Sequence, residues 1–361
     1  MATYREAERR LAEILVDVRR EGRKKLEPVT FAKFAREWLD TYPDSKDLKY
    51  STVEGYDGTI EKHLIPALGE KRLDSIDVAA IERYVAQKQK EVRPDERVGY
   101  APRTLNHHLN LLHLLFKAAE RRGLVRGNPV AAVERPRKSR RRWAILSPVE
   151  IGRVARAFDE LIDQAEDEAE RTWRGQARVV FLTVIGAGLR RGEILGLRWR
   201  HVFLADPESP RLEVRETFVR GRTDTPKSEK SERTISLDQA LAGELMDHRG
   251  RSPFSGDDER VFCSQTGGAI DPKRYADTLR LALAKAKIEQ PVRPFHDGRH
   301  TSITNGAAEG LSPGALMARA GHSDLATTQL YIDLAGEAFR EEAERLGARV
   351  FAHVRHNSGH K

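Results

Sequence analysis

The last quarter of the chain gathers side chains that can hold a phosphate ester and attack it. Three histidines, an arginine and a tyrosine stand close together there: His296, Arg299, His300, His322 and Tyr331. Imidazole and guanidinium groups can bind the oxygens of a phosphodiester, and a phenol can attack its phosphorus. This segment leads to the hypothesis of DNA strand cleavage, in which case the rest of the chain should bind DNA.

Two earlier segments offer further groups of the same kind. Arg190 follows a glycine-permitted turn at the mouth of a predicted short helix, and Glu193, one turn later, can orient its guanidinium. Lys227 lies in the loop of a hairpin predicted from strands at 211–220 and 233–237, where it could protonate a departing alkoxide. Each group taken alone has a plainer explanation: a surface ion pair, a solvated loop lysine, or, for Tyr331, a core aromatic in an apolar run.

The composition favours a polyanionic partner. Lys and Arg number 63 against 55 Asp and Glu in 361 residues, a formal net charge of +8, which suits nucleic acid but also a merely arginine-rich surface. Cys263, the only cysteine, can form neither an internal disulfide nor a Cys-based metal site. Residues 1–25 lack the apolar core of a signal peptide, and no apolar run approaches the roughly 20 residues of a membrane helix. We therefore expect a cytoplasmic protein without a membrane partner.

Periodicity and capping signals predict a mostly helical chain with a small β-sheet, an α+β fold. Residues 28–133 read as helices throughout, whereas the later part combines helices with the hairpin. Ser147 and Glu150 form a capping box that opens a helix of the second domain. The expected parts are a basic amphipathic helix at 1–27, a helical domain at 28–133, a basic linker at 134–143, a second domain at 144–350 and a tail at 351–361.

The basic linker and the C-terminal helix each allow two interpretations. Residues 134–142 crowd six Lys and Arg around Pro136, as either a solvated linker or a strap on phosphates, where each neutralised phosphate steepens the salt dependence of binding by roughly one unit. A helix expected at Glu337–Val350 carries one apolar face, which suits docking onto a neighbouring subunit or onto its own domain.

In this order and at these spacings, the segments resemble the tyrosine recombinase family, also called phage integrases. The boxes that carry the resemblance are Gly-Leu-Arg-x-x-Glu at Arg190 and Glu193, the hairpin lysine at Lys227, His-x-x-Arg-His at His296, Arg299 and His300, Gly-His at Gly321 and His322, and the nucleophile at Tyr331. Residues 64–69 and 104–106 are similar to the family's core-binding domain, so the resemblance spans about 28–335. Any one box is weak, and the ordered set is specific.

The resemblance implies a helical SAM-like core-binding domain followed by a mixed α/β catalytic domain, with residues 1–27 as a remnant of an arm-binding domain. It implies a site-specific DNA recombinase that forms a 3′-phosphotyrosyl intermediate and needs no cofactor, metal ion or ATP. The catalytic residues that it implies are Arg190, Lys227, His296, Arg299, His322 and Tyr331. The implied partners are double-stranded recombination sites, a homotetramer on DNA and an excisionase or DNA-bending protein, in a bacterium and on its nucleoid.

Within that set, the two arginines and His322 would bind the nonbridging phosphate oxygens, His296 would accept the phenol proton, and Lys227 would protonate the leaving 5′-oxygen. Lys230 lies three residues beyond Lys227 and competes for the last role. Gly298 stands where the family usually has leucine, and we expect it to weaken the helix by about 1 kcal/mol relative to alanine and to loosen the site.

The expected biological role is integration and excision of a mobile element. The alternatives are Xer-like resolution of chromosome or plasmid dimers, nicking and resealing by a type IB topoisomerase-like enzyme, and a catalytically silent DNA-binding regulator. A silent regulator would lack a key residue, and all six are present.

Overall fold

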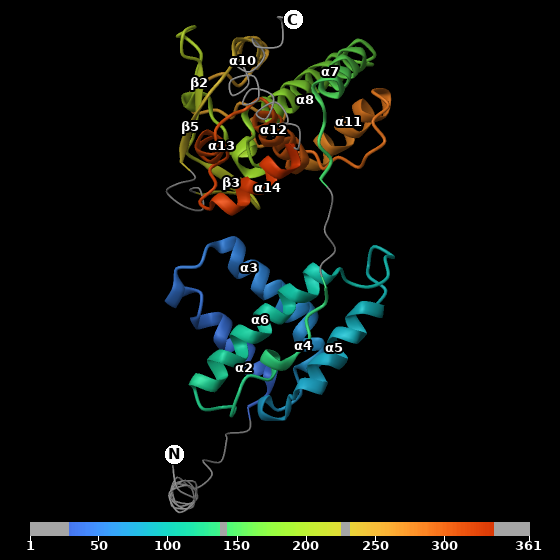
Figure 1. Ribbon diagram of the computed structural model, residues 1–361, viewed down its shortest axis with the longest axis vertical. Helices are drawn as coiled ribbons and strands as arrows, with labels where there is room; N and C mark the ends of the chain where they lie inside the picture. Colours follow the sequence, from blue (N-terminus) through green and yellow to red (C-terminus); the bar gives the residue numbers. More distant parts are fainter. Residues whose placement is uncertain (1–28, 138–142, 225–231, 336–361) are drawn as a thin grey trace, which may run out of the picture. The chain divides into compact units, whose positions relative to one another are not determined.

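The computed structural model describes residues 29–137, 143–224 and 232–335, and the chain divides into two compact units, Met1–Arg141 and Arg142–Lys361 (Figure 1). Several sequence expectations fall outside the described residues. They are the helices at 1–27 and Glu337–Val350, the tail at 351–361, the basic residues 138–142, and both candidate lysines, Lys227 and Lys230.

The first unit is built from helices around one apolar core. Its elements are α2 (Phe31–Thr41), α3 (Tyr50–Thr59), a π-helical segment (Ile60–Leu64), α4 (Ile65–Leu68), α5 (Val78–Lys90) and α6 (Pro102–Arg121), with 3-10 turns at Asp44–Lys46, Leu73–Ser75 and Pro129–Ala132. Helix α6 buries Leu105, Leu109, Leu112 and Phe116, which recur at helical spacing along one face. Thr30 caps α2 by accepting a hydrogen bond from the Lys33 amide.

The second unit combines helices with two small antiparallel sheets, so the predicted α+β fold class is confirmed. Its helices are α7 (Pro148–Asp163), α8 (Glu168–Ala187), α9 (Arg191–Gly196), α10 (Gln239–Arg251), α11 (Pro272–Lys285), α12 (His296–Ala308), α13 (Pro313–Ala320) and α14 (Leu325–Ala335), with a 3-10 turn at Trp199–His201. Its strands are β1 (Val202–Phe203), β2 (Arg211–Val214), β3 (Thr217–Val219), β4 (Arg222–Asp224) and β5 (Arg233–Ser236). The capping box of Ser147 and Glu150 opens α7, as predicted. Across the described part of the chain, no helix is long and apolar enough to cross a membrane.

The strand predicted at 211–220 is interrupted in the structure. Its first part, β2, pairs with β5 as expected, with Leu212 opposite Ile235, and β1 joins on the other side. Its second part, β3, pairs with β4 in a separate sheet and packs on α9. The break lies at Arg215 and Glu216, where Glu216 turns to form hydrogen bonds with Arg198 and Arg200. Alternation of apolar residues gave no sign of this ion-paired corner.

Helix α12 lies against α8 in the interior of the second unit, and Gly298 makes the close approach possible (Figure 1). A Cβ atom added at Gly298 would stand 2.6 Å from Cγ1 of Val184, well inside van der Waals contact. The glycine lowers helix propensity, but it lets the two helices meet closely. It therefore does not leave a gap in the packing, as a loosened site would.

Candidate active site

Five of the six residues assigned to chemistry lie in the described part of the second unit, and the fold brings them to one place. Arg190 precedes α9, His296 and Arg299 lie on α12, His322 follows α13, and Tyr331 lies on α14. Three contacts join these elements: Arg190 Nη2 donates to the Gly321 carbonyl at 2.9 Å, Arg299 Nη2 lies 3.2 Å from His322 Nε2, and the His322 and Tyr331 rings stack with centroids 5.6 Å apart.

Arg190 is held by a buried carboxylate. The Glu193 side chain, only 2% exposed, accepts from the Arg190 backbone amide and from its Nη1, both at 2.8 Å. It also accepts from Arg233 Nη1 and Nη2 at 3.0 and 2.8 Å. Burial alone would raise the pKa of Glu193, but the hydrogen bonds and charges of Arg233 and Arg190 outweigh burial and lower it to about 2. The carboxylate is thus ionised, while the Arg190 side chain stays 40% exposed and available to a ligand.

Sequence reasoning assigned Glu193 correctly as a neighbour of Arg190 but missed Arg233. This arginine lies on β5 with its side chain 5% exposed, and its Nε also donates to the Arg319 carbonyl at 2.8 Å. It therefore ties the three-stranded sheet to α9 and to the end of α13. A basic residue at the start of a predicted strand resembles any surface arginine, so the sequence offered no signal for this role.

Arg299 is buried against two helix ends. Its Nη1 donates to the Gly188 carbonyl at 2.6 Å and its Nη2 to the Ala320 carbonyl. Gly188 and Gly321 end α8 and α13 in the left-handed conformation, with φ of +66° and +60°, which glycine adopts without strain. Burial, followed by the charge of Arg190, lowers the pKa of Arg299 to about 9, so the guanidinium remains a cation at neutral pH.

His322 is neutral and bound on both sides. Its Nδ1 lies 3.0 Å from Thr328 Oγ1, opposite the Nε2 contact to Arg299. Burial, and then the positive charges of Arg299, Arg190 and Arg233, lowers the pKa of His322 to about 4. The ring therefore carries one N–H at neutral pH.

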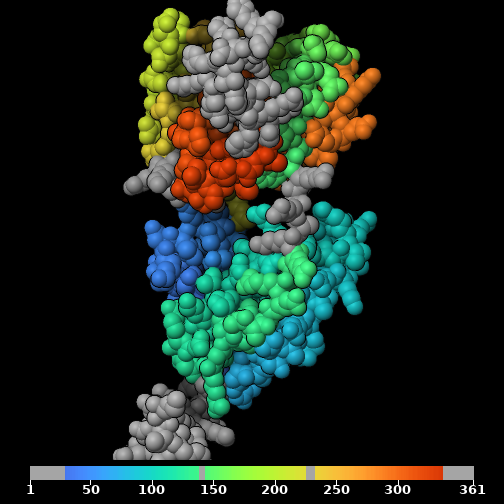
Figure 2. Space-filling model, viewed as in Figure 1, coloured from blue at the N-terminus to red at the C-terminus, as the bar shows by residue number. Residues whose placement is uncertain are grey.

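Tyr331 points inward although its helix forms part of the surface of the second unit, in the red segment of Figure 2. The side chain is 3% exposed, and its hydroxyl lies 2.8 Å from Nδ1 of His300. The indole of Trp143 stacks on the His300 ring at a centroid distance of 3.9 Å and an interplanar angle of 6°. Burial raises the pKa of the Tyr331 phenol, and burial followed by the charge of His296 lowers the pKa of His300 to about 3.

Two of these contacts were missed from the sequence. His300 belongs to the His-x-x-Arg-His box but was given no role, whereas its Nδ1 is the hydrogen-bond partner of the phenol. His296, expected as the proton acceptor, packs edge-on against His300 with ring centroids 4.3 Å apart. Trp143 was placed at the end of the basic linker, and an aromatic after a run of arginines gives no indication of its partner 157 positions later.

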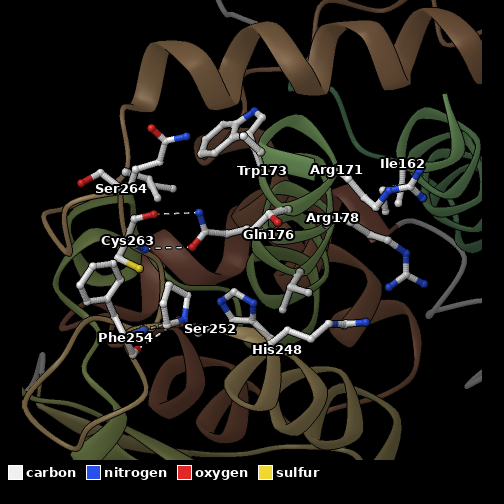
Figure 3. Close-up of a pocket in the computed structure, with 18 of the residues that line it drawn as sticks. Ile162, Arg171, Trp173, Gln176, Arg178, His248, Ser252, Phe254, Cys263 and Ser264 are labelled. Atoms are coloured by element: carbon white, nitrogen blue, oxygen red, sulfur yellow. Dashed lines mark hydrogen bonds between the residues drawn. The ribbon is translucent and has the colours of Figure 1, made fainter. Parts of the chain in front are cut away.

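The residues that meet around Tyr331 do not line the large cavity of this unit. Figure 3 shows that cavity, of about 1040 Å³, bordered by Trp173, Gln176, His248 and Phe254. In it, the Gln176 amide donates to the Cys263 carbonyl and accepts from the Cys263 amide, both at 2.9 Å. Neither Arg190, Arg299 nor Tyr331 lines it, so the candidate site lies outside this cavity. Among the described residues, no cluster of three His, Cys, Asp or Glu side chains is suited to a metal ion.

Both units of the chain match known protein families, and the chain is similar to known recombinases and integrases. The model of the phage integrase family matches residues 156–337, and that of the phage integrase N-terminal SAM-like domain matches residues 30–89. The chain is 24% identical to a tyrosine recombinase XerC-like protein of Caldanaerobacter subterraneus, over 90% of this chain and 84% of the relative. It is 22% identical to an integrase of Saccharopolyspora erythraea, over 90% and 83%. In fold, it is similar to the Tn1549 transposon integrase solved with transposon right end DNA, with a TM-score of 0.70, 19% identity, and coverage of 89% of this chain and 100% of that one.

Proposed function

The chain belongs to the phage integrase family and is a site-specific tyrosine recombinase, and we propose that it cuts and rejoins DNA through a 3′-phosphotyrosyl link to Tyr331. The observation that carries this assignment is the convergence of Arg190, Arg299 and His322 beside the Tyr331 ring. Two cations and an imidazole next to a phenol provide the groups that a phosphodiester and its attacking oxygen need.

The two arginines would bind and neutralise the nonbridging oxygens of the phosphate under attack. The Arg190 side chain is 40% exposed and Glu193 fixes the position of its guanidinium, so it can bind an incoming phosphate with little loss of conformational freedom. Arg299 is held by the Gly188 carbonyl from deeper in the unit and supplies a second fixed positive charge. Because these charges are preorganised, they stabilise the charge that develops in the transition state. We therefore expect cleavage to proceed in the presence of a chelator.

The phenol would lose its proton as it attacks phosphorus. His300 Nδ1 lies 2.8 Å from the phenol oxygen in the described arrangement, but an imidazole whose pKa is lowered to about 3 is a weak acceptor for the proton of a phenol whose pKa is raised. We interpret this pair as a resting arrangement. A phosphate anion near the site would raise the pKa of His300, and either His300 or its neighbour His296 could then accept the proton.

The attack forms the bond from Tyr331 to the 3′-phosphate and breaks the bond to the 5′-oxygen, which takes a proton. Lys227 remains the proposed proton donor and Lys230 its competitor. The phosphotyrosyl link retains the ester, so the 5′-hydroxyl of another strand can attack it and rejoin DNA without ATP. Exchange between two duplexes requires four such sites, and we propose that the chain acts as a homotetramer on its recombination sites.

Mobile-element integration and excision is the role that we propose, with an excisionase or DNA-bending protein as a further partner. The similarity to an integrase of S. erythraea supports it. The similarity to a XerC-like recombinase, at comparable identity and coverage, supports resolution of chromosome or plasmid dimers as the second candidate. Junction sequencing in a host that carries the gene separates the two: insertion or excision junctions support the first role, and dimer-to-monomer conversion supports the second.

The chemistry can be tested with a nicked suicide substrate. The DNA would carry a recombination site recovered by selecting duplexes that the full chain binds, with a nick that lets the 5′-hydroxyl fragment diffuse away. In EDTA, the wild type should form an adduct that survives SDS, and Tyr331→Phe should form none. Lys227→Ala and Lys230→Ala, assayed in parallel, identify the acid, because only loss of the true donor slows adduct formation sharply. No adduct on a bound site, or an adduct with Tyr331→Phe, would contradict the proposal.

A further inference from the structure

Thr328 places a buried hydroxyl against the His322 ring. It lies on α14 one helical turn before Tyr331, with no exposed surface, and its Oγ1 is 3.0 Å from His322 Nδ1. On the opposite side of the ring, Nε2 lies 3.2 Å from Nη2 of Arg299. Both ring nitrogens are therefore engaged, and the position of the ring hydrogen decides which one donates.

The partners determine that position in the described arrangement. A guanidinium has only donors, so Nε2 must accept from Arg299. The ring is neutral at pH 7 because burial, and then the charges of Arg299, Arg190 and Arg233, lowers its pKa to about 4. Its single hydrogen consequently lies on Nδ1 and is donated to Thr328 Oγ1.

Binding a phosphate requires the opposite form. A nonbridging phosphate oxygen is an acceptor, so His322 can bind it only with a hydrogen on Nε2. When the ring loses its Nδ1 hydrogen and gains one at Nε2 through solvent, Nδ1 becomes an acceptor. A hydroxyl suits this exchange, because it can accept from Nδ1 in one form and rotate to donate to Nδ1 in the other. A carbonyl or carboxylate in its place would hold His322 in the first form.

We propose that Thr328 is a positioning residue whose hydroxyl lets His322 change from accepting a hydrogen bond from Arg299 to donating one to the phosphate. This inference rests on the proposed function, because it assigns His322 to the phosphate. The role is assigned to Thr328 and not to its neighbour Thr327, because Thr328 is buried against the ring whereas Thr327 is exposed on α14.

The test compares substitutions that differ in the hydroxyl and little else. Thr328→Val keeps the β-branched shape and removes the hydroxyl, and Thr328→Ser keeps the hydroxyl. Adduct formation on the suicide substrate should slow about tenfold with Thr328→Val, as expected for the loss of one hydrogen bond of about 1.4 kcal/mol in the transition state. Thr328→Ser should stay within about twofold of wild type, and Thr327→Val, the matched control, should be unchanged. If the valine variant folds poorly, adduct formation by Thr328→Ala can be compared with that by Thr328→Ser, because the two side chains differ only in one oxygen atom.

A spectroscopic measurement keeps this inference separate from the proposed function. Long-range ¹H–¹⁵N correlations of the DNA-free full chain report which nitrogen of His322 carries the hydrogen. We expect Nδ1–H in the wild type and in Thr328→Ser, and a mixture of the two forms in Thr328→Val. An Nε2–H ring in the wild type, a valine variant that cuts at the wild-type rate, or a serine variant as slow as the valine variant would overturn the inference. A wild type that forms no adduct but shows Nδ1–H would instead overturn the proposed function and leave the contact standing.

Discussion

The hydroxyl of Tyr331 lies 2.8 Å from Nδ1 of His300, and the indole of Trp143 stacks on that imidazole. The proposed nucleophile is thus hydrogen-bonded and buried in the described arrangement. Because Tyr331 is only 3% exposed, a phosphate can reach the phenol only after the groups around it move.

A double-mutant cycle can measure this hydrogen bond. His300→Phe keeps a flat ring against Trp143 but leaves the buried phenol without its partner, which typically costs about 1–3 kcal/mol. We expect His300→Phe to lower the free energy of unfolding of the wild type. In a chain that already carries Tyr331→Phe, the same substitution should lower it much less. Urea titrations of the four proteins should give a coupling energy of about 1 kcal/mol. Additive effects within about 0.3 kcal/mol would show that the two groups do not interact in solution.

Glu193 is predicted to be essential to the stability of the second unit. Glu193→Gln removes the charge that lies between Arg190 and Arg233, and loss of one partner of a buried ion pair typically costs about 3–5 kcal/mol. Urea unfolding followed by fluorescence reports this loss, because Trp143, Trp173 and Trp199 all lie in this unit. The control is Asp277→Asn, which removes the exposed pair with Arg280 and should leave the unfolding curve unchanged. A wild-type curve for Glu193→Gln would contradict the prediction.

The lowered pKa values of His300 and His322 predict that the folded protein loses stability in mild acid. The pKa of His300 is lowered to about 3 and that of His322 to about 4, whereas both titrate near 6.5 in the unfolded chain. The unfolded state therefore binds more protons below pH 6.5, and the free energy of unfolding should fall as the pH drops from 6.5 toward 4. We expect a decrease of about 2 kcal/mol or more between pH 7.5 and pH 5, with a smaller decrease for His300→Phe. Glu193 adds its own loss only below pH 4.5, because its folded pKa is about 2. A flat profile from pH 7.5 to 5 would show that the rings are accessible to protons.

Replacing Gly298 with alanine should destabilise the second unit, although alanine has the higher helix propensity. Alanine usually stabilises a helix interior by about 1 kcal/mol over glycine, but a Cβ at this position would meet Val184 at 2.6 Å. Gly298→Ala should therefore lower the midpoint of thermal unfolding, and Val184→Ala in the same chain should restore part of the loss. Gly152 of α7 is the matched control, since nothing lies within 4 Å of an added Cβ, and Gly152→Ala should raise the midpoint. An increase for both alanine variants would show that the contact between α8 and α12 can relax.

The sequence predicted contacts between residues that lie one helical turn apart. The capping box of Ser147 and Glu150 and the contact of Arg190 with Glu193 both depend on a spacing of three residues, and both are found in the structure. The contacts that were missed join distant segments. Trp143 reaches His300 and Arg233 reaches Glu193 only through tertiary packing, which no local periodicity encodes. The interruption of the strand at 211–220 has the same origin, because Glu216 pairs with arginines that precede it by 16 and 18 positions.

The two arginines proposed to bind phosphate both donate hydrogen bonds to the C-terminal end of α13: Arg190 to the Gly321 carbonyl and Arg299 to the Ala320 carbonyl. This helix end, His322 and Tyr331 are all translated after Arg190, His296 and Arg299. A nascent chain that has emerged only as far as α12 has its arginines but neither their anchor nor the attacking phenol. The order of synthesis therefore delays the proposed ability to cut DNA until α13 and α14 have been made.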